Sequence, residues 1–126
     1  MRVLIADDDA EIRYLVGQVL RHACADVEIF EARDGAEALA VHADVAADAV
    51  LLDFRMPGGP DGLAVARHIR NGDSAQMIVL LTADASDLEL QAQANEIDVR
   101  VWHKLDMVRL PEFLMEGRDS RRGRRR

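Results

Sequence analysis

The sequence predicts an α/β protein with a doubly wound parallel sheet that is covered by helices on both faces. Five short apolar runs alternate with five longer segments whose apolar residues recur at helical spacing. The runs are nearly continuous rather than alternating, which is typical of strands buried on both faces. Hydrophobic residues make up 49% of the 126 residues, enough for one domain with a sizeable core. In such sheets ligands bind outside the carboxyl ends of the strands.

The first half of the chain supplies three strands and two helices. Residues 2–6 (RVLIA) predict the first strand, and apolar residues at helical spacing predict an amphipathic helix over roughly 10–23. Residues 27–32 (VEIFEA) predict a second strand. The next helix begins at Asp34-Gly35, and we expect its buried face to hold Ala36, Leu39, Ala40 and Ala43. Residues 48–53 (DAVLLD) predict a buried third strand that ends in an acid.

The second half continues the alternation after a loop at 54–61, which is rich in Pro and Gly. A third helix carries Leu63, Ala66 and Ile69 on one stripe and ends at Asn71-Gly72. The remaining elements are a strand at 76–82, a helix at 84–96, a strand at 99–102 and a last helix with Pro111 in its first turn.

The net charge of −7 is unevenly distributed. Residues 1–117 carry −12, whereas residues 118–126 (RDSRRGRRR) carry +5. We therefore expect a folded domain over 1–117, which its charge makes a poor binder of nucleic acid, and an Arg-rich disordered tail over 118–126. An alternative is that this tail contacts nucleic acid or an acidic partner.

Other features bear on the compartment. No apolar run approaches the roughly 20 residues of a membrane span, and three aspartates at 7–9 are unlike a secretory signal. One cysteine, Cys24, excludes an internal disulfide. We expect a cytoplasmic protein with no membrane contact.

Polar side chains gather where the predicted strands end: Asp7, Asp8, Asp53, Thr82 and Lys104. Like charges in one cleft raise each other's pKa, and a bound cation would relieve this repulsion. Carboxylate oxygens without His or Cys in the set indicate Mg²⁺, with Mn²⁺ as an alternative. The four histidines fall on different elements and predict no metal site.

Each residue alone also has a structural interpretation. Asp8 with Glu11 could cap the first helix, Asp53 could merely end a strand, and Lys104 could lie on the surface. Lys104 is, however, the single lysine in a chain with fifteen arginines, and acids at separate strand ends weaken the structural interpretation when taken together.

With these motifs the chain resembles the receiver domain of bacterial two-component response regulators. The resemblance covers about residues 2–115. It depends on five motifs: I-A-D-D-D at 5–9, L-L-D-F-R-M-P at 51–57, D-G-L at 61–63, L-L-T-A at 80–83, and Lys104. It implies a flavodoxin-like (βα)5 fold with strand order 2-1-3-4-5.

The resemblance also implies roles for individual residues. Asp53 would accept a phosphoryl group from a histidine kinase or a histidine phosphotransfer protein. Thr82 and Lys104 would each bind a phosphoryl oxygen. The Mg²⁺ ligands would be Asp7, Asp8, Asp53 and the main-chain carbonyl of Arg55. Such a domain would be no turnover enzyme but a switch for an unknown downstream protein, as a monomer or a weak phosphorylation-dependent dimer.

The chain departs from the family's pattern mainly around the last strand. Leu105 follows the lysine where the family usually has a cis proline, so we expect a trans peptide with a reshaped loop, or a strained one. Val101 replaces the usual aromatic switch residue, and Trp102 beside it should point to the opposite face. Ile97-Asp98 replaces a small pair, and the 54–61 loop has one extra residue before Gly62. We expect a competent pocket with an unusual output surface.

Arg55 and Asp84 lie two residues beyond Asp53 and Thr82, respectively. In the family these positions tune the loss of the phosphoryl group. An opposite-charge pair there would bridge the site and hinder an attacking water.

Three alternatives stay open. The chain could be a pseudo-receiver that binds partners without phosphorylation, or a receiver fragment of a transcriptional regulator whose Arg-rich end begins a linker. It could also be a metal-dependent phosphohydrolase, but that class usually places a second Asp where this chain has Arg55.

Overall fold

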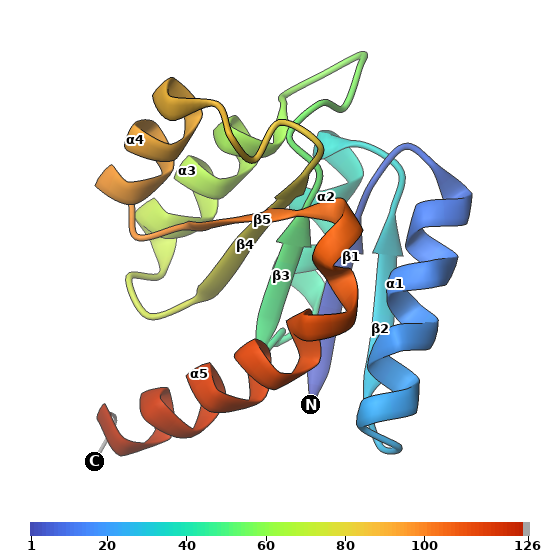
Figure 1. Ribbon diagram of the computed structural model, residues 1–126. Coiled ribbons are helices and arrows are strands. Elements are labelled where there is room, and N and C mark those ends of the chain that lie inside the picture. The colour runs from blue at the N-terminus through green and yellow to red at the C-terminus, as the bar shows by residue number, and fades with distance from the viewer. Residues whose placement is uncertain (125–126) are drawn as a thin grey trace.

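The computed structural model describes residues 1–124, with the side chains of residues 1–117. One parallel sheet runs through the centre of the molecule (Figure 1). Its strands are β1 (Arg2–Ala6), β2 (Glu28–Ala32), β3 (Ala49–Leu52), β4 (Met77–Thr82) and β5 (Arg100–His103). Their spatial order is β2-β1-β3-β4-β5, as predicted, and every neighbouring pair is parallel.

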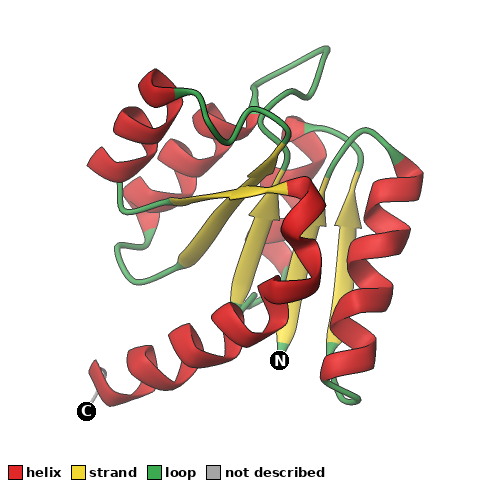
Figure 2. Cartoon of the chain, viewed as in Figure 1, coloured by secondary structure: helices red, strands yellow, loops and turns green. Residues whose placement is uncertain are grey.

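Helices cover both faces of the sheet (Figure 2). They are α1 (Ala10–Ala23), α2 (Gly35–Asp44), α3 (Gly62–Gly72), α4 (Leu88–Glu96) and α5 (Leu110–Arg124), with a 3-10 segment, η1 (Lys104–Arg109), before the last. Buried residues of α1 and α5 share one core cluster, whereas those of α2, α3 and α4 share the other. The predicted doubly wound architecture is confirmed.

Strand β1 shows why the apolar runs are continuous. Leu4 and Ala6 belong to the core under α2–α4, whereas Val3 and Ile5 belong to the core under α1 and α5. Because successive side chains point to opposite faces, a strand covered on both sides needs an apolar residue at each position.

Aspartates cap four of the helices. Asp9, Asp34, Asp61 and Asp87 each accept a hydrogen bond from a main-chain amide in the first turn of the helix that follows. Such a cap stabilises a helix by about 1 kcal/mol. The interpretation of Asp8 as the cap of the first helix is wrong, because Asp9 has that role and α1 begins at Ala10.

Two expected elements are displaced. Helix α4 begins at Leu88 rather than at residue 84, because the carboxylate of Asp87 accepts from two amides and fixes the start there. Residues 83–86 form a turn instead. The last strand is Arg100–His103, one residue later than 99–102.

The buried face of α2 also differs from the prediction. Ala38 is fully buried and Leu39 is partly buried, whereas Ala36, Ala40 and Ala43 are exposed. Small apolar residues occur nearly all round this helix, so the sequence pattern selects its buried face only weakly.

The chain after β5 has two features beyond the prediction. Segment η1 precedes α5, and Pro111 lies in the first turn of α5 as expected. Helix α5 then leads away from the sheet (Figure 1) and continues through Arg124. The expected disordered tail at 118–126 therefore falls on described helical backbone up to 124, and residues 125–126 lie outside the described part. Within that part, no helix is long and apolar enough to cross a membrane.

Candidate functional site

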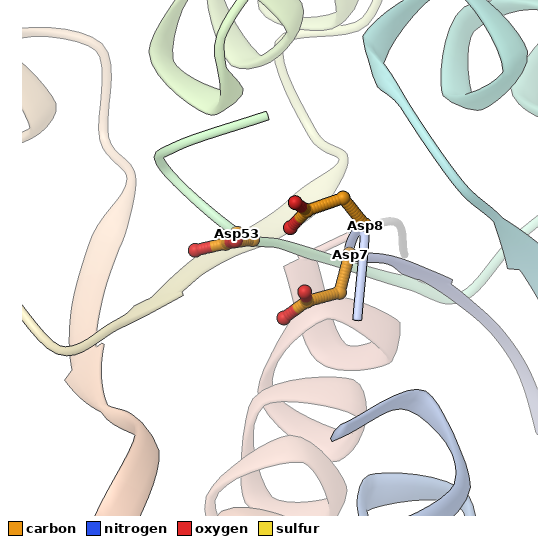
Figure 3. A group of neighbouring side chains, drawn as sticks. All are labelled: Asp7, Asp8 and Asp53. Carbon is orange, nitrogen blue, oxygen red and sulfur yellow. The ribbon is translucent and has the colours of Figure 1, made fainter. Parts of the chain in front are cut away.

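Three carboxylates converge at the carboxyl edge of the sheet (Figure 3). One oxygen from each of Asp7, Asp8 and Asp53 lies within 4.8 Å of the others. The sheet register explains this, because Ala6 of β1 pairs with Leu52 of β3 and the following residues are therefore neighbours. The amide of Asp53 donates to the carbonyl of Ala6 at 2.8 Å, which fixes the two strand ends together.

Lysine 104 enters this acidic cluster from the end of β5. Its Nζ lies 3.0 Å from Oδ2 of Asp7 and 3.2 Å from Oδ1 of Asp53. Asp7 is 3% exposed and Asp53 is 6% exposed, so both ion pairs lie largely out of water. One ammonium facing three carboxylates leaves the pocket with a net negative charge.

The electrostatics of the pocket disfavour an ionised Asp53. Burial, followed by the negative charge of Asp7, raises the pKa of Asp53 from 3.8 to about 6, although Lys104 opposes the shift. Burial alone would lower the pKa of Lys104, but its hydrogen bonds and ion pairs with the two acids raise it above the usual value. Both groups are charged at neutral pH, and Asp53 is ionised at a cost.

This charge excess fits a divalent cation. The donors are oxygens, two of them belong to buried residues, and they lie close enough to share one ion. Asp8 is exposed, and Asp9 rather than Asp8 caps α1, so the Asp8 carboxylate is not engaged as a helix cap. The arrangement can hold a metal ion through Asp7, Asp8 and Asp53, and the main chain of Arg55 is beside them, because its amide hydrogen-bonds Asp53.

Asp7 is held by contacts that the sequence did not reveal. Its Oδ1 accepts from the Asp9 amide at 2.9 Å. The guanidinium of Arg13 donates to the main-chain carbonyl of Asp7 at 2.7 Å and pairs with Glu31 at 3.0 Å. Arg13 thus joins α1, β2 and the end of β1, and nothing in its spacing distinguishes it from a surface arginine.

Two glycines shape the loop that follows Asp53. A Cβ on Gly62 would lie 2.1 Å from the carbonyl oxygen of Asp53, so the chain passes its own strand end too closely for any side chain. A Cβ on Gly35 would lie 2.2 Å from the carbonyl oxygen of Pro60. At Pro60 the loop before Gly62 therefore lies directly against the start of α2.

Thr82 and the Arg55–Asp84 pair lie along the same edge. Thr82 ends β4, is 1% exposed, and accepts a hydrogen bond from the Asp84 amide at 3.0 Å. The guanidinium of Arg55 donates to Asp84 at 2.6 Å, across the gap between the chain segments that follow β3 and β4. The side chain of Arg55 is 73% exposed and also lies over the ring of Phe54.

The departures around β5 have clear structural outcomes. Val101 packs against the core under α2–α4 and Trp102 against the core under α1 and α5, as their alternation predicts. Across the described residues no peptide bond is cis, so the bond between Lys104 and Leu105 is trans. The loop is reshaped into η1, which is the first of the two outcomes expected from the sequence.

Comparison with known proteins places the chain in a family. The family model for the response regulator receiver domain matches residues 3–101. The transcriptional regulatory protein ResD of Bacillus subtilis is 38% identical over 86 residues, which cover 68% of this chain and 34% of that protein. A protein-glutamate methylesterase/protein-glutamine glutaminase of Myxococcus xanthus is 36% identical over 94 residues, covering 75% of this chain and 27% of that protein.

A solved structure is also similar. The response regulator TrrA of Thermotoga maritima, in complex with Mg²⁺ and BeF, is 34% identical, with a TM-score of 0.77, over 92% of this chain and 97% of that one. The chain belongs to the response regulator receiver domain family of two-component systems. Its cluster of Asp7, Asp8 and Asp53 is consistent with Mg²⁺ binding and aspartyl phosphorylation.

The matched part spans only about a third or less of the first curated relatives. One of them is a methylesterase and another a transcriptional regulator, so homologues that share this receiver differ in their output. Receiver domains of this family are signalling domains that histidine kinases regulate.

Proposed function

We propose that Asp53 accepts a phosphoryl group from the phosphohistidine of a histidine kinase or a histidine phosphotransfer protein. The observation that carries this proposal is the geometry of the pocket: a buried carboxylate flanked by a lysine ammonium at 3.2 Å and by two further acids. Phosphoryl transfer needs mainly positioning and neutralisation of charge, and these groups provide both.

The proposed transfer is a direct displacement at phosphorus. An oxygen of the Asp53 carboxylate forms the new O–P bond while the N–P bond of the donor breaks. The electron pair of that bond stays on the donor imidazole, which takes a proton from solvent. Asp53 must be ionised to attack, and with its pKa raised to about 6 it is ionised at neutral pH. Lys104 then lies where it can pair with an oxygen of the transferred group.

Asp7, Asp8 and Asp53, with the carbonyl of Arg55, are the groups that we propose hold Mg²⁺, or alternatively Mn²⁺. When bound, the ion supplies positive charge to the phosphoryl oxygens and offsets the excess of carboxylates. The Mg²⁺ and BeF held by the similar receiver of Thermotoga maritima support this choice of ion.

The charge that arrives at Asp53 would act on its neighbours. The hydroxyl of Thr82 would donate to a phosphoryl oxygen, and the bond that this hydroxyl already accepts from the Asp84 amide joins β4 to the turn before α4. A change in that bond would shift the turn and the start of α4, and with them a surface read by a downstream protein. We also propose that the domain, residues 1–117, works in the cytoplasm as a monomer or a weak phosphorylation-dependent dimer and does not bind nucleic acid.

The Arg55–Asp84 pair would control how long the phosphoryl group stays. It bridges the segments that follow β3 and β4 beside Asp53, so an attacking water must pass or displace it. Solvent screens an ion pair this exposed, so a modest effect is expected.

The proposal is tested by incubating the chain with acetyl phosphate and Mg²⁺ and recording its intact mass. We expect a gain of one phosphoryl group, and no gain with EDTA or in Asp53→Asn. The absence of any gain, under conditions that label a known receiver, would contradict the proposal.

A second candidate is a pseudo-receiver that binds its partner without phosphorylation. The ion pairs of Lys104 favour it, because they already neutralise part of the pocket without a metal ion or phosphoryl group. In that case no phosphoryl group would be gained, and the mass of the chain would be unchanged by Mg²⁺ and acetyl phosphate.

A further inference from the structure

The loop that follows Lys104 is held by a side chain, His103, that no sequence pattern singles out as functional. Leu105 stands where the family usually has proline, so it carries a main-chain N–H. This N–H donates to Nδ1 of His103 at 3.0 Å, and His103 thereby caps the first turn of η1. The imidazole accepts at Nδ1, so the neutral ring carries its proton on Nε2.

The residue before His103 holds the same loop from the other side of the strand. The indole N–H of Trp102 donates to the carbonyl of Asp106 at 2.8 Å. Asp106 has φ −102° and ψ 23°, the point at which η1 departs from helical geometry. The Trp102 ring is itself fixed, since Phe113 packs against it at 5.1 Å between ring centroids.

Lys104 lies between the two anchored parts of the chain. Before it, the pairing of Thr82 with His103 is the last in the sheet. After it, the amide of Leu105 and the carbonyl of Asp106 are bonded to side chains of β5. If Leu105 and Asp106 lost these bonds, the main chain of Lys104 would be free to rotate. Rotation would move the Lys104 Nζ away from the two carboxylates that it now contacts at 3.0 and 3.2 Å.

We propose that His103 and Trp102 are positioning residues that hold Lys104 in place, doing with two side-chain hydrogen bonds what the usual proline does by restricting the chain. The proposal rests on the phosphoryl-accepting function proposed above. It assigns to His103 a role in the rate of phosphorylation although His103 is exposed and touches no reacting group. We call His103 and Trp102, with their hydrogen bonds to Leu105 and Asp106, the brace. Neither of the two residues belongs to the acidic cluster.

Substitutions at position 103 separate the hydrogen bond from the rest of the side chain. In His103→Asn, the amide oxygen lies as far from the main chain as Nδ1 and can accept the Leu105 N–H. In His103→Gln, the oxygen lies one bond further out, and His103→Ala has no acceptor. His68→Ala is the matched control, because His68 is also exposed but lies in the middle of α3.

The first measurement is the rate of phosphorylation by acetyl phosphate with Mg²⁺. We expect His103→Ala and His103→Gln to be slower by about two- to tenfold, the range of one hydrogen bond, and His103→Asn and His68→Ala to match the original chain. In a Leu105→Pro background the N–H is absent, so His103→Ala should cause no further loss. Leu105 is 88% exposed, and this substitution therefore disturbs little packing.

The second measurement does not need phosphorylation. The chain has one lysine and one tryptophan, so ¹⁵N placed at the main-chain nitrogen of lysine and at the indole nitrogen of tryptophan gives one signal from Lys104 and one from Trp102. Both signals should move in His103→Ala and return in His103→Asn.

Equal rates and unmoved signals in His103→Ala, or a His103→Asn variant that behaves like His103→Ala, would overturn the proposed brace. If the original chain gains no phosphoryl group at all, the proposed function fails. The two NMR signals still decide whether His103 and Trp102 position Lys104.

Discussion

The acidic pocket and the β5–η1 segment meet at Lys104, yet they are built differently. In the pocket, Asp7, Asp8 and Asp53 lie where the strand ends place them. In the segment after Trp102, the main chain takes a path set by two hydrogen bonds between side chain and main chain. A sheet edge thus fixes where charge gathers, whereas a connecting loop can reach the same lysine by more than one local solution.

The largest expected effect separates the acids of the pocket from the acids that cap helices. Asp53→Asn should abolish the gain of a phosphoryl group, because an amide oxygen is a poor nucleophile. Asp61→Asn is the matched control, since Asn is as good a cap as Asp and Asp61 caps α3 outside the pocket. Intact mass after incubation with acetyl phosphate and Mg²⁺ measures both. A phosphorylated Asp53→Asn chain would place the acceptor elsewhere.

Lys104 should affect phosphorylation and metal binding in opposite directions. Lys104→Met removes the ammonium that pairs with Asp7 and Asp53. We expect the phosphorylation rate to fall by about 10²–10³-fold, as for a lost charge-stabilising donor. Mg²⁺ should bind more tightly, because the ion no longer competes with the lysine for the same carboxylates.

Isothermal titration calorimetry gives the affinity for Mg²⁺, and intact mass against time gives the rate. If Lys104→Met weakened Mg²⁺ binding, the lysine would be supporting the metal site rather than competing for it.

The raised pKa of Asp53 predicts a pH-dependent gain in stability when its charge is removed. The native chain holds the proton up to about pH 6, whereas the unfolded chain releases it near 3.8, so ionisation of Asp53 lowers stability as the pH rises between these values. The full difference corresponds to at most about 3 kcal/mol. In EDTA, Asp53→Asn should therefore melt several degrees above the original chain at pH 7.5, and the gap should narrow below pH 5.

Mg²⁺ should close that gap by stabilising the original chain alone. Melting followed by circular dichroism at several pH values, with and without Mg²⁺, measures the difference. If the difference in melting temperature between Asp53→Asn and the original chain grew toward acidic pH, the surroundings would be stabilising the ionised form of Asp53 rather than destabilising it.

The smallest expected effect lies at the rim of the pocket. Arg55→Ala opens the bridge to Asp84 and should speed loss of the phosphoryl group by about two- to fivefold, in line with an exposed pair. The main-chain carbonyl of residue 55 is kept in this variant, so the metal site should be unaffected. The half-life of the phosphorylated chain after removal of acetyl phosphate is the measurement, and an unchanged half-life would leave the pair without this role.

Most of the fold could be predicted because strands that are buried on both faces consist of continuous apolar runs, which are easily recognised in the sequence. The grouping of Asp7, Asp8 and Asp53 also followed, since acids at the ends of adjacent parallel strands must be neighbours. The choice among successive acids did not follow. Asp8 and Asp9 are equivalent as cap candidates by residue type, and only the structure, in which α1 begins at Ala10, selects Asp9.

The supports of the pocket escaped prediction for a different reason. Arg13 reaches the carbonyl of Asp7, and His103 and Trp102 reach main-chain groups of η1. Bonds from a side chain to the main chain depend on the local path of the chain and leave no recognisable pair of residue types in the sequence. The start of α4 was misplaced likewise, because Asp84 and Asp87 both resemble caps and the Asp84 amide is bonded to Thr82.

Trapping the acyl phosphate chemically would show whether Asp53 is the phosphoacceptor. The chain is incubated with acetyl phosphate and Mg²⁺ and treated with borohydride, which reduces an acyl phosphate to an alcohol, and its peptides are then sequenced by mass spectrometry. We predict homoserine at position 53, dependent on Mg²⁺, with Asp7 and Asp8 unchanged. Homoserine at another aspartate, or at none while a known receiver is trapped under the same conditions, would contradict the account.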